Sequence, residues 1–249
     1  YIYKGLKTVY WCPYCETALA EAEIEYKDDK SFSIYVKFKA VDLNCHMPKG
    51  ADPEKVFALI WTTTPWTIPC NLAISANENF EYVWVKVSDE YLLMAKDLVE
   101  PTMKAGKVEN YEVLPEVMMG KQLEGLVFQH PFYDRKVPVL LGDHVTLEAG
   151  TGLVHTAPDH GQDDFEVCMK YASWGVKPIG TVDPSGKYTD KVPGYEGQFV
   201  FDANVPVIKQ LASIGALFAK STFRHQYPHC WRCKNPIIYR ATEQWFSSV

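Results

Sequence analysis

The sequence lacks several features, and each absence excludes a class of protein. No apolar run approaches the length of a membrane span, and no signal peptide opens the chain. There is no internal repeat, no low-complexity linker and no evident Ser/His/Asp arrangement of a covalent hydrolase. With 47% hydrophobic residues among 249, the composition is ordinary for a globular protein. We expect one large or two small domains without membrane association, and the abrupt ends predict a piece of a larger protein.

Strong positive charge is also missing. The net charge is −6, so the surface as a whole is unsuited to tight, nonspecific binding of nucleic acid. The charge is nevertheless uneven, because residues 220–240 contain no Asp or Glu. The basic residues of that stretch are Lys220, Arg224, Arg232, Lys234 and Arg240. This end of the chain either contacts phosphate or forms a solvated basic face, and the sequence leaves both open.

Three consecutive threonines follow an apolar run, and this is the most informative stretch of the chain. Residues 56–60 (VFALI) predict a buried strand, and Thr62, Thr63 and Thr64 come directly after Trp61. Pro65 stops the ladder of the strand, which favours a step that directs side chains into a cleft. Neutral hydroxyls there suit an ester, a ribose or a water. The alternative is a threonine-rich strand end whose hydroxyls bond to nearby backbone.

A second segment, residues 150–165 (GTGLVHTAPDHGQDDF), carries an imidazole and a carboxylate. A short strand is expected to end at His155, and residues 161–174 predict a helix. Asp164 then falls in the first helical turn, where the helix dipole favours an acid. The segment therefore indicates either a packed histidine with a helix cap, or a carboxylate and an imidazole that face the same cleft as the threonines.

Two CxxC pairs lie near opposite ends of the sequence, Cys12/Cys15 and Cys230/Cys233. Four thiolates in two such pairs match a tetrahedral structural zinc site, which would tie the two ends of the domain together. The alternative is that these cysteines are unpaired structural thiols. The remaining cysteines are scattered, which favours a reducing, cytoplasmic setting.

The coarse secondary structure is mixed. Strands are expected at 31–39, 80–87, 91–95, 137–141 and 145–147. Helices are expected at 96–104, 162–174 and 205–219. Many strands with few helices between them argue against a doubly wound parallel sheet and favour a mixed α/β fold of the α+β type.

The two motifs together resemble the editing domain (connective peptide 1) of isoleucyl-tRNA synthetases. Residues 18–26, 227–234 and 239–246 agree with that family, and Trp66 separates the chain from its valyl and leucyl relatives. The resemblance implies a class Ia synthetase editing-domain fold, with a β-barrel-like core, peripheral helices and a zinc knuckle pair near the termini. It also implies an editing domain at 31–220. Residues 1–30 and 221–249 would form a zinc-bearing base that links it to the parent synthetase.

The activity implied by the resemblance is hydrolytic proofreading. Isoleucine and valine differ by one methylene, which a hydrophobic pocket separates only weakly, so a second site must destroy the mischarged product. The substrates would be valyl-tRNA(Ile) and valyl-adenylate, and the partners would be the 3′ acceptor end of tRNA(Ile), the valine moiety and the rest of the synthetase. Neither HIGH-type nor KMSKS-type motifs occur, so the chain should not activate amino acids.

The resemblance also implies residue roles. Asp164 would bind the substrate ammonium, while His155 and Trp66 would wall the side-chain pocket. The hydroxyls of Thr62, Thr63 and Thr64 would bond the ester, the ribose or the attacking water, in an order that the sequence leaves open. Gly150, Thr151 and Gly152 would approach the adenosine. Zinc would be structural, and water would attack directly without a cofactor.

Two competing functions stay open. In the first, the chain is a noncatalytic module that docks the tRNA acceptor end. In the second, it is an editing domain for another amino acid, of the valyl or leucyl type. Deacylation of matched esters distinguishes them.

Overall fold

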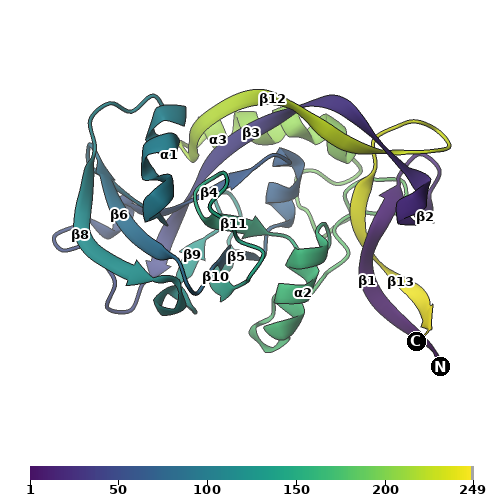
Figure 1. Cartoon of the computed structure of the whole chain (residues 1–249), viewed down its shortest axis with the longest axis horizontal. Coiled ribbons are helices and arrows are strands. Elements are labelled where there is room, and N and C mark those ends of the chain that lie inside the picture. Colours follow the sequence, from purple (N-terminus) through teal and green to yellow (C-terminus); the bar gives the residue numbers. More distant parts are fainter. Residues whose placement is uncertain (248–249) are drawn as a thin grey trace.

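The structure, a computed structural model that describes residues 1–247, is dominated by strands (Figure 1). One sheet has three strands in the order β13-β1-β2, and the other has ten in the order β12-β3-β9-β10-β5-β11-β4-β7-β6-β8. The prediction of a mixed α+β fold is confirmed. Among the described residues, no helix has the length and apolar character that a membrane crossing requires.

The strands are β1 Ile2–Cys12, β2 Thr17–Leu19, β3 Ile24–Asp42, β4 Val56–Thr62, β5 Ala73–Ala76, β6 Glu81–Val87, β7 Glu90–Ala95, β8 Glu112–Met119, β9 Val127–Gln129, β10 Lys136–Leu141, β11 Leu153–Thr156, β12 Leu217–Cys230 and β13 Ile238–Ser247. The α-helices are α1 Val99–Ala105, α2 Gln162–Lys170 and α3 Asn204–Ser213. Short 3₁₀ helices are η1 Glu21–Glu23, η2 Pro53–Lys55, η3 Pro65–Cys70, η4 Lys96–Leu98, η5 Gly120–Leu123, η6 Ala172–Trp174 and η7 Val200–Ala203.

The molecule contains two long antiparallel ribbons, one along its length and one at its right-hand end (Figure 1). In the first, β12 pairs with β3 from Leu217↔Val36 to Cys230↔Ile24. In the second, β1 pairs with β13 from Ile2↔Ser247 to Trp11↔Ile238, so the two ends of the described chain lie side by side. The division predicted at residues 30 and 221 falls inside β3 and β12, which run through it without interruption. Positions 248 and 249 of the predicted base lie outside the described residues.

Six strands of the large sheet pair in a circuit that returns to its start. The order is β3–β9–β10–β5–β11–β4, and β4 pairs again with β3. Apolar side chains from these strands are fully buried, among them Ile34, Phe38, Phe128 and Val139. Because β11 runs parallel to β4, with Val154 opposite Trp61, the carboxyl ends of both strands meet at one edge.

Several expected elements are present in the structure. Residues 31–39 lie in the longer β3, 80–87 correspond to β6, 91–95 to β7 and 137–141 to β10. The helix expected at 96–104 is η4 followed by α1, and the helix at 162–174 is α2 followed by η6.

Two expected elements are wrong. Residues 145–147 form no strand, because they belong to a loop in which Val145 packs inside and its carbonyl accepts from the Asn77 side-chain amide. The helix expected at 205–219 ends at Ser213. Gly215 has a φ of +71°, which glycine adopts readily, and the chain then enters β12.

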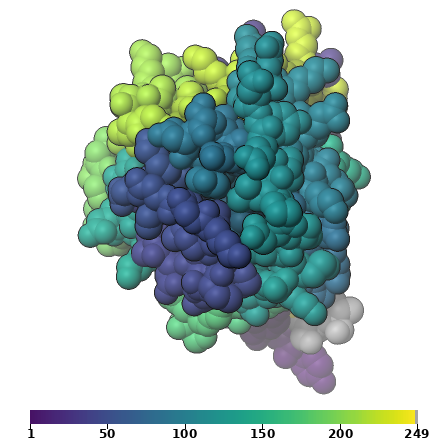
Figure 2. All heavy atoms as spheres, turned by 90° about the vertical axis from the view of Figure 1, so that its left-hand side faces the viewer, coloured from purple at the N-terminus to yellow at the C-terminus, as the bar shows by residue number. Residues whose placement is uncertain are grey.

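The end of the molecule that carries β6, β8 and α1 lies far from the β1–β13 ribbon (Figure 1). Viewed from that side, it presents a continuous surface made largely by residues of the first half of the chain (Figure 2). The polar motifs of the sequence lie elsewhere, between β4, β11 and α2.

Candidate active site

A cavity of about 450 Å³ opens where β4 and β11 end and α2 begins. It is lined by Trp61, Thr62, Thr63, Thr64, Thr67, Val154, His155, His160, Gly161, Gln162, Asp163, Asp164 and Tyr239. The structure thus brings the three threonines, His155 and Asp164 together from segments about ninety positions apart in the sequence. The parallel pairing of β4 with β11 is what places them at one edge.

The local sequence explains why the threonines face the cavity. Thr62 is the last residue of β4, and Thr64 caps the 3₁₀ helix η3, whose first residue is Pro65. Because proline has no N–H and fixes its φ, the chain leaves the ladder and turns there. The hydroxyls are therefore presented on a tight turn rather than along a strand.

The hydroxyls form a continuous chain. Thr62 Oγ1 lies 3.2 Å from Thr64 Oγ1, which lies 3.1 Å from Thr67 Oγ1. The Thr67 hydroxyl donates to the Thr64 carbonyl oxygen at 2.7 Å, so its other contacts are as an acceptor. It follows that Thr64 donates to Thr67 and Thr62 donates to Thr64. Thr62 Oγ1 also accepts from the Thr64 N–H at 3.2 Å, which leaves Thr62 Oγ1 and Thr64 Oγ1 with one free lone pair each.

The His155 ring is buried and held at both nitrogens. Nε2 lies 2.7 Å from Thr67 Oγ1, and Nδ1 lies 3.1 Å from Asn71 Nδ2, which also donates to the Ala73 carbonyl at 2.8 Å. Since the amide nitrogen can only donate, Nδ1 accepts and the proton sits on Nε2. Burial, and then the neighbouring His160, lower the pKa of His155 to about 3. The imidazole is a neutral, fixed wall of the cavity.

Asp164 lies in the first turn of α2, only partly exposed, and its Oδ2 accepts from the Ala157 N–H at 2.9 Å. Burial raises the pKa of Asp164 to about 7; Asp163 adds to the rise, and the hydrogen bond from Ala157 opposes it. The carboxyl group therefore changes charge near neutral pH. A cation placed beside it would favour the ionised form.

Residues that the sequence-based site did not include complete the walls. Thr67 and Asn71 belong to the first motif, and His160 to the second, so their segments were identified but their roles were not. His160 Nδ1 donates to the Tyr239 carbonyl at 3.0 Å, and His160 Nε2 lies 2.7 Å from Thr181 Oγ1. Nothing in the sequence pattern indicated Tyr239, which reaches the cavity from β13.

Comparison with known proteins identifies the family. A model of the class I tRNA synthetases (I, L, M and V) matches residues 1–249. The chain belongs to this family. It is 52% identical to an isoleucine–tRNA ligase from Caldicellulosiruptor bescii and 53% identical to one from Thermoanaerobacter pseudethanolicus, over 100% of its own length and 27% and 26% of theirs. The resemblance expected from the motifs is confirmed, and the chain spans about a quarter of these relatives.

Solved structures with the same fold are leucyl-tRNA synthetase editing domains. The domain from P. falciparum matches with a TM-score of 0.58 at 10% identity, over 76% of this chain and 99% of that one. The domain from P. knowlesi matches with a TM-score of 0.57 at 11% identity, over 84% and 100%. At such low identity the likeness establishes the fold of this class I synthetase chain.

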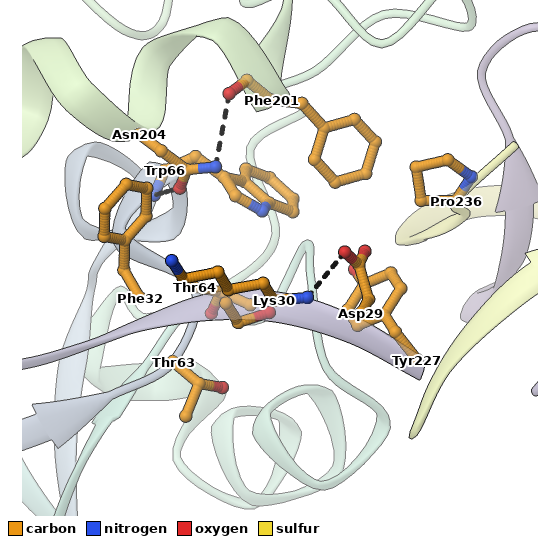
Figure 3. A pocket seen from close by; sticks show the side chains of 11 residues that line it. Asp29, Lys30, Phe32, Thr63, Thr64, Trp66, Phe201, Asn204, Tyr227 and Pro236 are labelled. Atoms are coloured by element: carbon orange, nitrogen blue, oxygen red, sulfur yellow. Dashed lines mark hydrogen bonds between the residues drawn. The ribbon is translucent and has the colours of Figure 1, made fainter. Parts of the chain in front are cut away.

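Trp66 does not line the cavity that holds His155 and Asp164. It lies between two adjoining cavities, of about 230 and 250 Å³, and both of them also include Thr64. The backbone N–H of Trp66 donates to Asn204 Oδ1 at 3.1 Å (Figure 3). The centroid of its ring lies 4.8 Å from that of His160. Trp66, which was expected to wall the same pocket as His155, is thus next to the threonines but on their other side.

The structure also places Gly150, Thr151 and Gly152 outside the cavity. Their three carbonyls accept from Thr102 Oγ1, the Ala95 N–H and the Tyr82 hydroxyl. Gly150 has a φ of +83°, and a β-carbon there would lie 2.9 Å from the Trp61 ring. Gly150 therefore lets the loop pack against Trp61, which itself lines the cavity, while Gly152 packs against Ala95. The backbone carbonyls of all three residues are engaged within the protein.

The four cysteines of the two CxxC pairs converge. Their sulfur atoms all lie within 4.8 Å of one another, and Cys12 Sγ lies 3.4 Å from Cys233 Sγ. Tetrahedral Zn²⁺ with Zn–S bonds of about 2.3 Å sets its sulfurs about 3.8 Å apart, so the donor set fits such an ion. The Cys15 N–H also points at Cys12 Sγ, at 3.4 Å. The cluster lies where β1 and β12 end, near the base of both ribbons.

Proposed function

We propose that this chain hydrolyses valyl-tRNA(Ile) and valyl-adenylate, as the proofreading part of an isoleucine–tRNA ligase. The observation that carries the proposal is the shared cavity: Asp164, the hydroxyls at 62 to 64 and His155 all line it. A cation anchor, a steric wall and hydroxyls for an ester are the three parts that such a reaction needs.

Asp164 anchors the amino group of the substrate. Its carboxylate lies in a partly buried position with one hydrogen bond from Ala157, which leaves acceptor sites for an ammonium. A charge-assisted contact of this kind both binds and orients the substrate. An ammonium fixed at this wall directs the side chain and the ester toward the other walls.

His155 sets the size limit of the side-chain pocket. Because both ring nitrogens are engaged, the ring cannot turn aside for a larger side chain without breaking buried hydrogen bonds. A pocket with such a wall admits valine and refuses the extra methylene of isoleucine by overlap. Steric overlap rejects the larger isoleucine more strongly than a pocket built for isoleucine disfavours the smaller valine.

The threonine hydroxyls hold the ester end. The free lone pairs on Thr62 Oγ1 and Thr64 Oγ1 suit donors, such as a ribose hydroxyl or the attacking water. Among residues 1–247, no cysteine, serine or lysine lines the cavity, and His155 stays neutral because its pKa is far below 7. We therefore infer direct attack by a positioned water on the ester carbonyl carbon. The water gives up a proton to solvent, the ester C–O bond breaks, and the departing ribose oxygen takes up a proton from solvent.

The cysteine cluster and the β1–β13 ribbon form the base of the domain. We propose that Cys12, Cys15, Cys230 and Cys233 hold a structural Zn²⁺, and that residues 1–30 and 221–249 connect the editing domain, 31–220, to the remaining synthetase. The circuit of six paired strands is the barrel-like core in this proposal. Free thiols at all seven cysteines suit a reducing, cytoplasmic setting.

Deacylation of matched esters tests the function. The chain should release valine from valyl-tRNA(Ile) and leave isoleucyl-tRNA(Ile) intact, while threonyl esters report on other specificities. Binding of tRNA without release of any amino acid would identify a docking module instead.

A further inference from the structure

We propose that the 230 Å³ cavity beside the threonines binds the nucleotide that precedes the terminal adenosine of the tRNA acceptor strand (Figure 3). The inference rests on the proposed function and names a second subsite for its polynucleotide substrate. In tRNA this nucleotide is a cytidine. An aminoacyl-adenylate has no such nucleotide, so the cavity would serve one of the two substrates and not the other.

Continuity with the ester pocket supports this position. Thr63 and Thr64 line both cavities and form the wall between them. An ester held by the threonines sits on the terminal ribose, and the strand continues from that ribose through its 5′ phosphate. The next nucleotide must therefore lie within one sugar–phosphate step of the ester. This cavity adjoins the ester pocket across Thr63 and Thr64, and Asp164 lines only the ester pocket.

The walls of the cavity suit an unpaired base. Trp66 is buried, and its backbone is fixed because its N–H donates to the Asn204 side chain and its carbonyl accepts from the Tyr188 hydroxyl. The half-buried rings of Phe201 and Tyr227 complete the apolar sides (Figure 3). Proteins hold single-stranded nucleic acid by stacking bases on aromatic rings of this kind.

The polar side of the cavity carries one charge of each sign. Lys30 is exposed and makes no ion pair among residues 1–247, so its ammonium is available to a phosphate. Asp29 Oδ1 accepts from the Lys30 N–H at 2.7 Å, which fixes the carboxylate at the rim. Its second oxygen can accept from the exocyclic amine of cytosine, as acidic side chains do in base recognition.

The experiment compares substrates that differ only in this nucleotide. For wild type and variants, KM is measured with valyl-tRNA(Ile) and with 3′-valyladenosine, and the Kd is measured for the dinucleotide CpA and for adenosine. Phe201→Ala should raise KM for the tRNA and Kd for CpA by roughly fivefold to a hundredfold, and leave both adenosine probes unchanged. Phe201→Tyr, which keeps an aromatic face, should restore the affinity.

Lys30→Gln should lower the salt dependence of CpA binding by about 0.7 in the log–log slope, the value for one contact to single-stranded phosphate. The controls lie outside the cavity: Lys27→Gln is on β3, as Lys30 is, and Phe223→Ala removes an aromatic ring from β12. They should leave all four measurements unchanged.

Unchanged CpA binding in both Phe201→Ala and Lys30→Gln overturns the inference. Equal losses with adenosine and CpA also overturn it, because the cavity would then serve the terminal nucleotide. Since the dinucleotide is measured by binding, this result stands even if no ester is hydrolysed, which would refute the proposed function alone.

Discussion

The two polar clusters of this chain are built in opposite ways. In the cavity, the hydroxyls and His155 satisfy one another through hydrogen bonds of 2.7 to 3.2 Å. At the base, four sulfurs approach within 4.8 Å of one another, and thiols are weak hydrogen-bonding groups. The hydroxyls and His155 hold one another without a bound molecule, whereas the proposed metal would supply the main stabilisation of the cysteine cluster.

In our proposal the cavity serves catalysis and the cysteine cluster serves stability. Most walls of the cavity are neutral groups. Of its two carboxyl groups, Asp163 is exposed, whereas Asp164 is partly buried and is the one proposed to bind the substrate ammonium. The cysteine cluster joins the ends of two ribbons and takes no part in the cavity. Changes at one cluster should therefore leave the property of the other largely intact.

The largest effect is expected at Asp164. Asp164→Ala removes the partner of the substrate ammonium, and losing one member of a partly buried charge pair costs about 2–5 kcal/mol. The kcat/KM for valyl-tRNA(Ile) should fall by at least about thirtyfold, while zinc content stays the same. The matched control is Glu166→Ala, an exposed carboxylate on the same helix outside the cavity. Normal activity of the Asp164 variant contradicts the anchor role.

The second prediction concerns the cysteine cluster, which should affect stability and not activity. Cys230→Ser should lower bound zinc from about one equivalent toward none and reduce Tm by several degrees, because a structural metal contributes folding free energy. Activity of the protein that remains folded should change little. Cys45→Ser, at an exposed and isolated cysteine, is the control. Retention of a full equivalent of zinc by Cys230→Ser rules out this ligand set.

The selectivity prediction concerns His155. His155→Ala removes the fixed wall, so isoleucyl-tRNA(Ile) should become a substrate, and the valyl-to-isoleucyl ratio of kcat/KM should fall about tenfold or more. Thr67 and Asn71 would lose a buried partner, which should lower the free energy of unfolding by about 1–3 kcal/mol. An unchanged ratio would place the wall on another lining residue, such as Trp61.

The pH dependence of the rate tests whether the ionised Asp164 carboxylate is needed for activity. The pKa of free Asp164 is about 7, so the ionised anchor is lost as the pH falls through that value. Between pH 7 and 5, kcat/KM for valyl-tRNA(Ile) should fall about tenfold per unit, since the substrate amine is already charged there. Asp164→Asn should show a low, flat profile. A wild-type profile equally flat over this range would exclude Asp164 as the titrating group.

The smallest effect is a gain in stability. Because burial raises the folded pKa of Asp164 from 3.8, the ionised carboxylate opposes folding above pH 7, and this cost fades as the pH falls toward 4. Asp164→Asn should increase the free energy of unfolding by on the order of 2 kcal/mol at pH 8 and by less at pH 5. Chemical denaturation at the two pH values measures it, and equal gains at both would attribute the effect to packing.

The sequence was informative where one face of an element is buried. The alternation in 31–39 predicted its part of β3 well, because Ile34, Val36 and Phe38 are fully buried while the residues between them are partly exposed. The same reasoning extended helix 205–219 too far. Phe218 continues the apolar spacing, but it does so from β12, where it packs against Gly106 at the end of α1. Periodicity does not report the positive φ at Gly215.

For the cavity, the two motifs predicted the segments and most of the side chains. Trp66 was expected on the same wall as His155, yet η3 turns its ring to the other side of the threonines. Gly150 was expected near the ligand, but its missing β-carbon serves packing on Trp61. Such outcomes depend on how a turn is oriented in three dimensions, which spacing along the chain does not specify.

The buried imidazole has a further consequence for how acidity acts on proofreading. With its pKa near 3, the His155 ring keeps one protonation state throughout the range in which cells operate, while Asp164 switches within that range. The choice between valine and isoleucine would then be independent of pH, whereas the rate of hydrolysis would depend on it. A cell that acidifies would edit more slowly, yet the identity of the amino acid removed would stay the same.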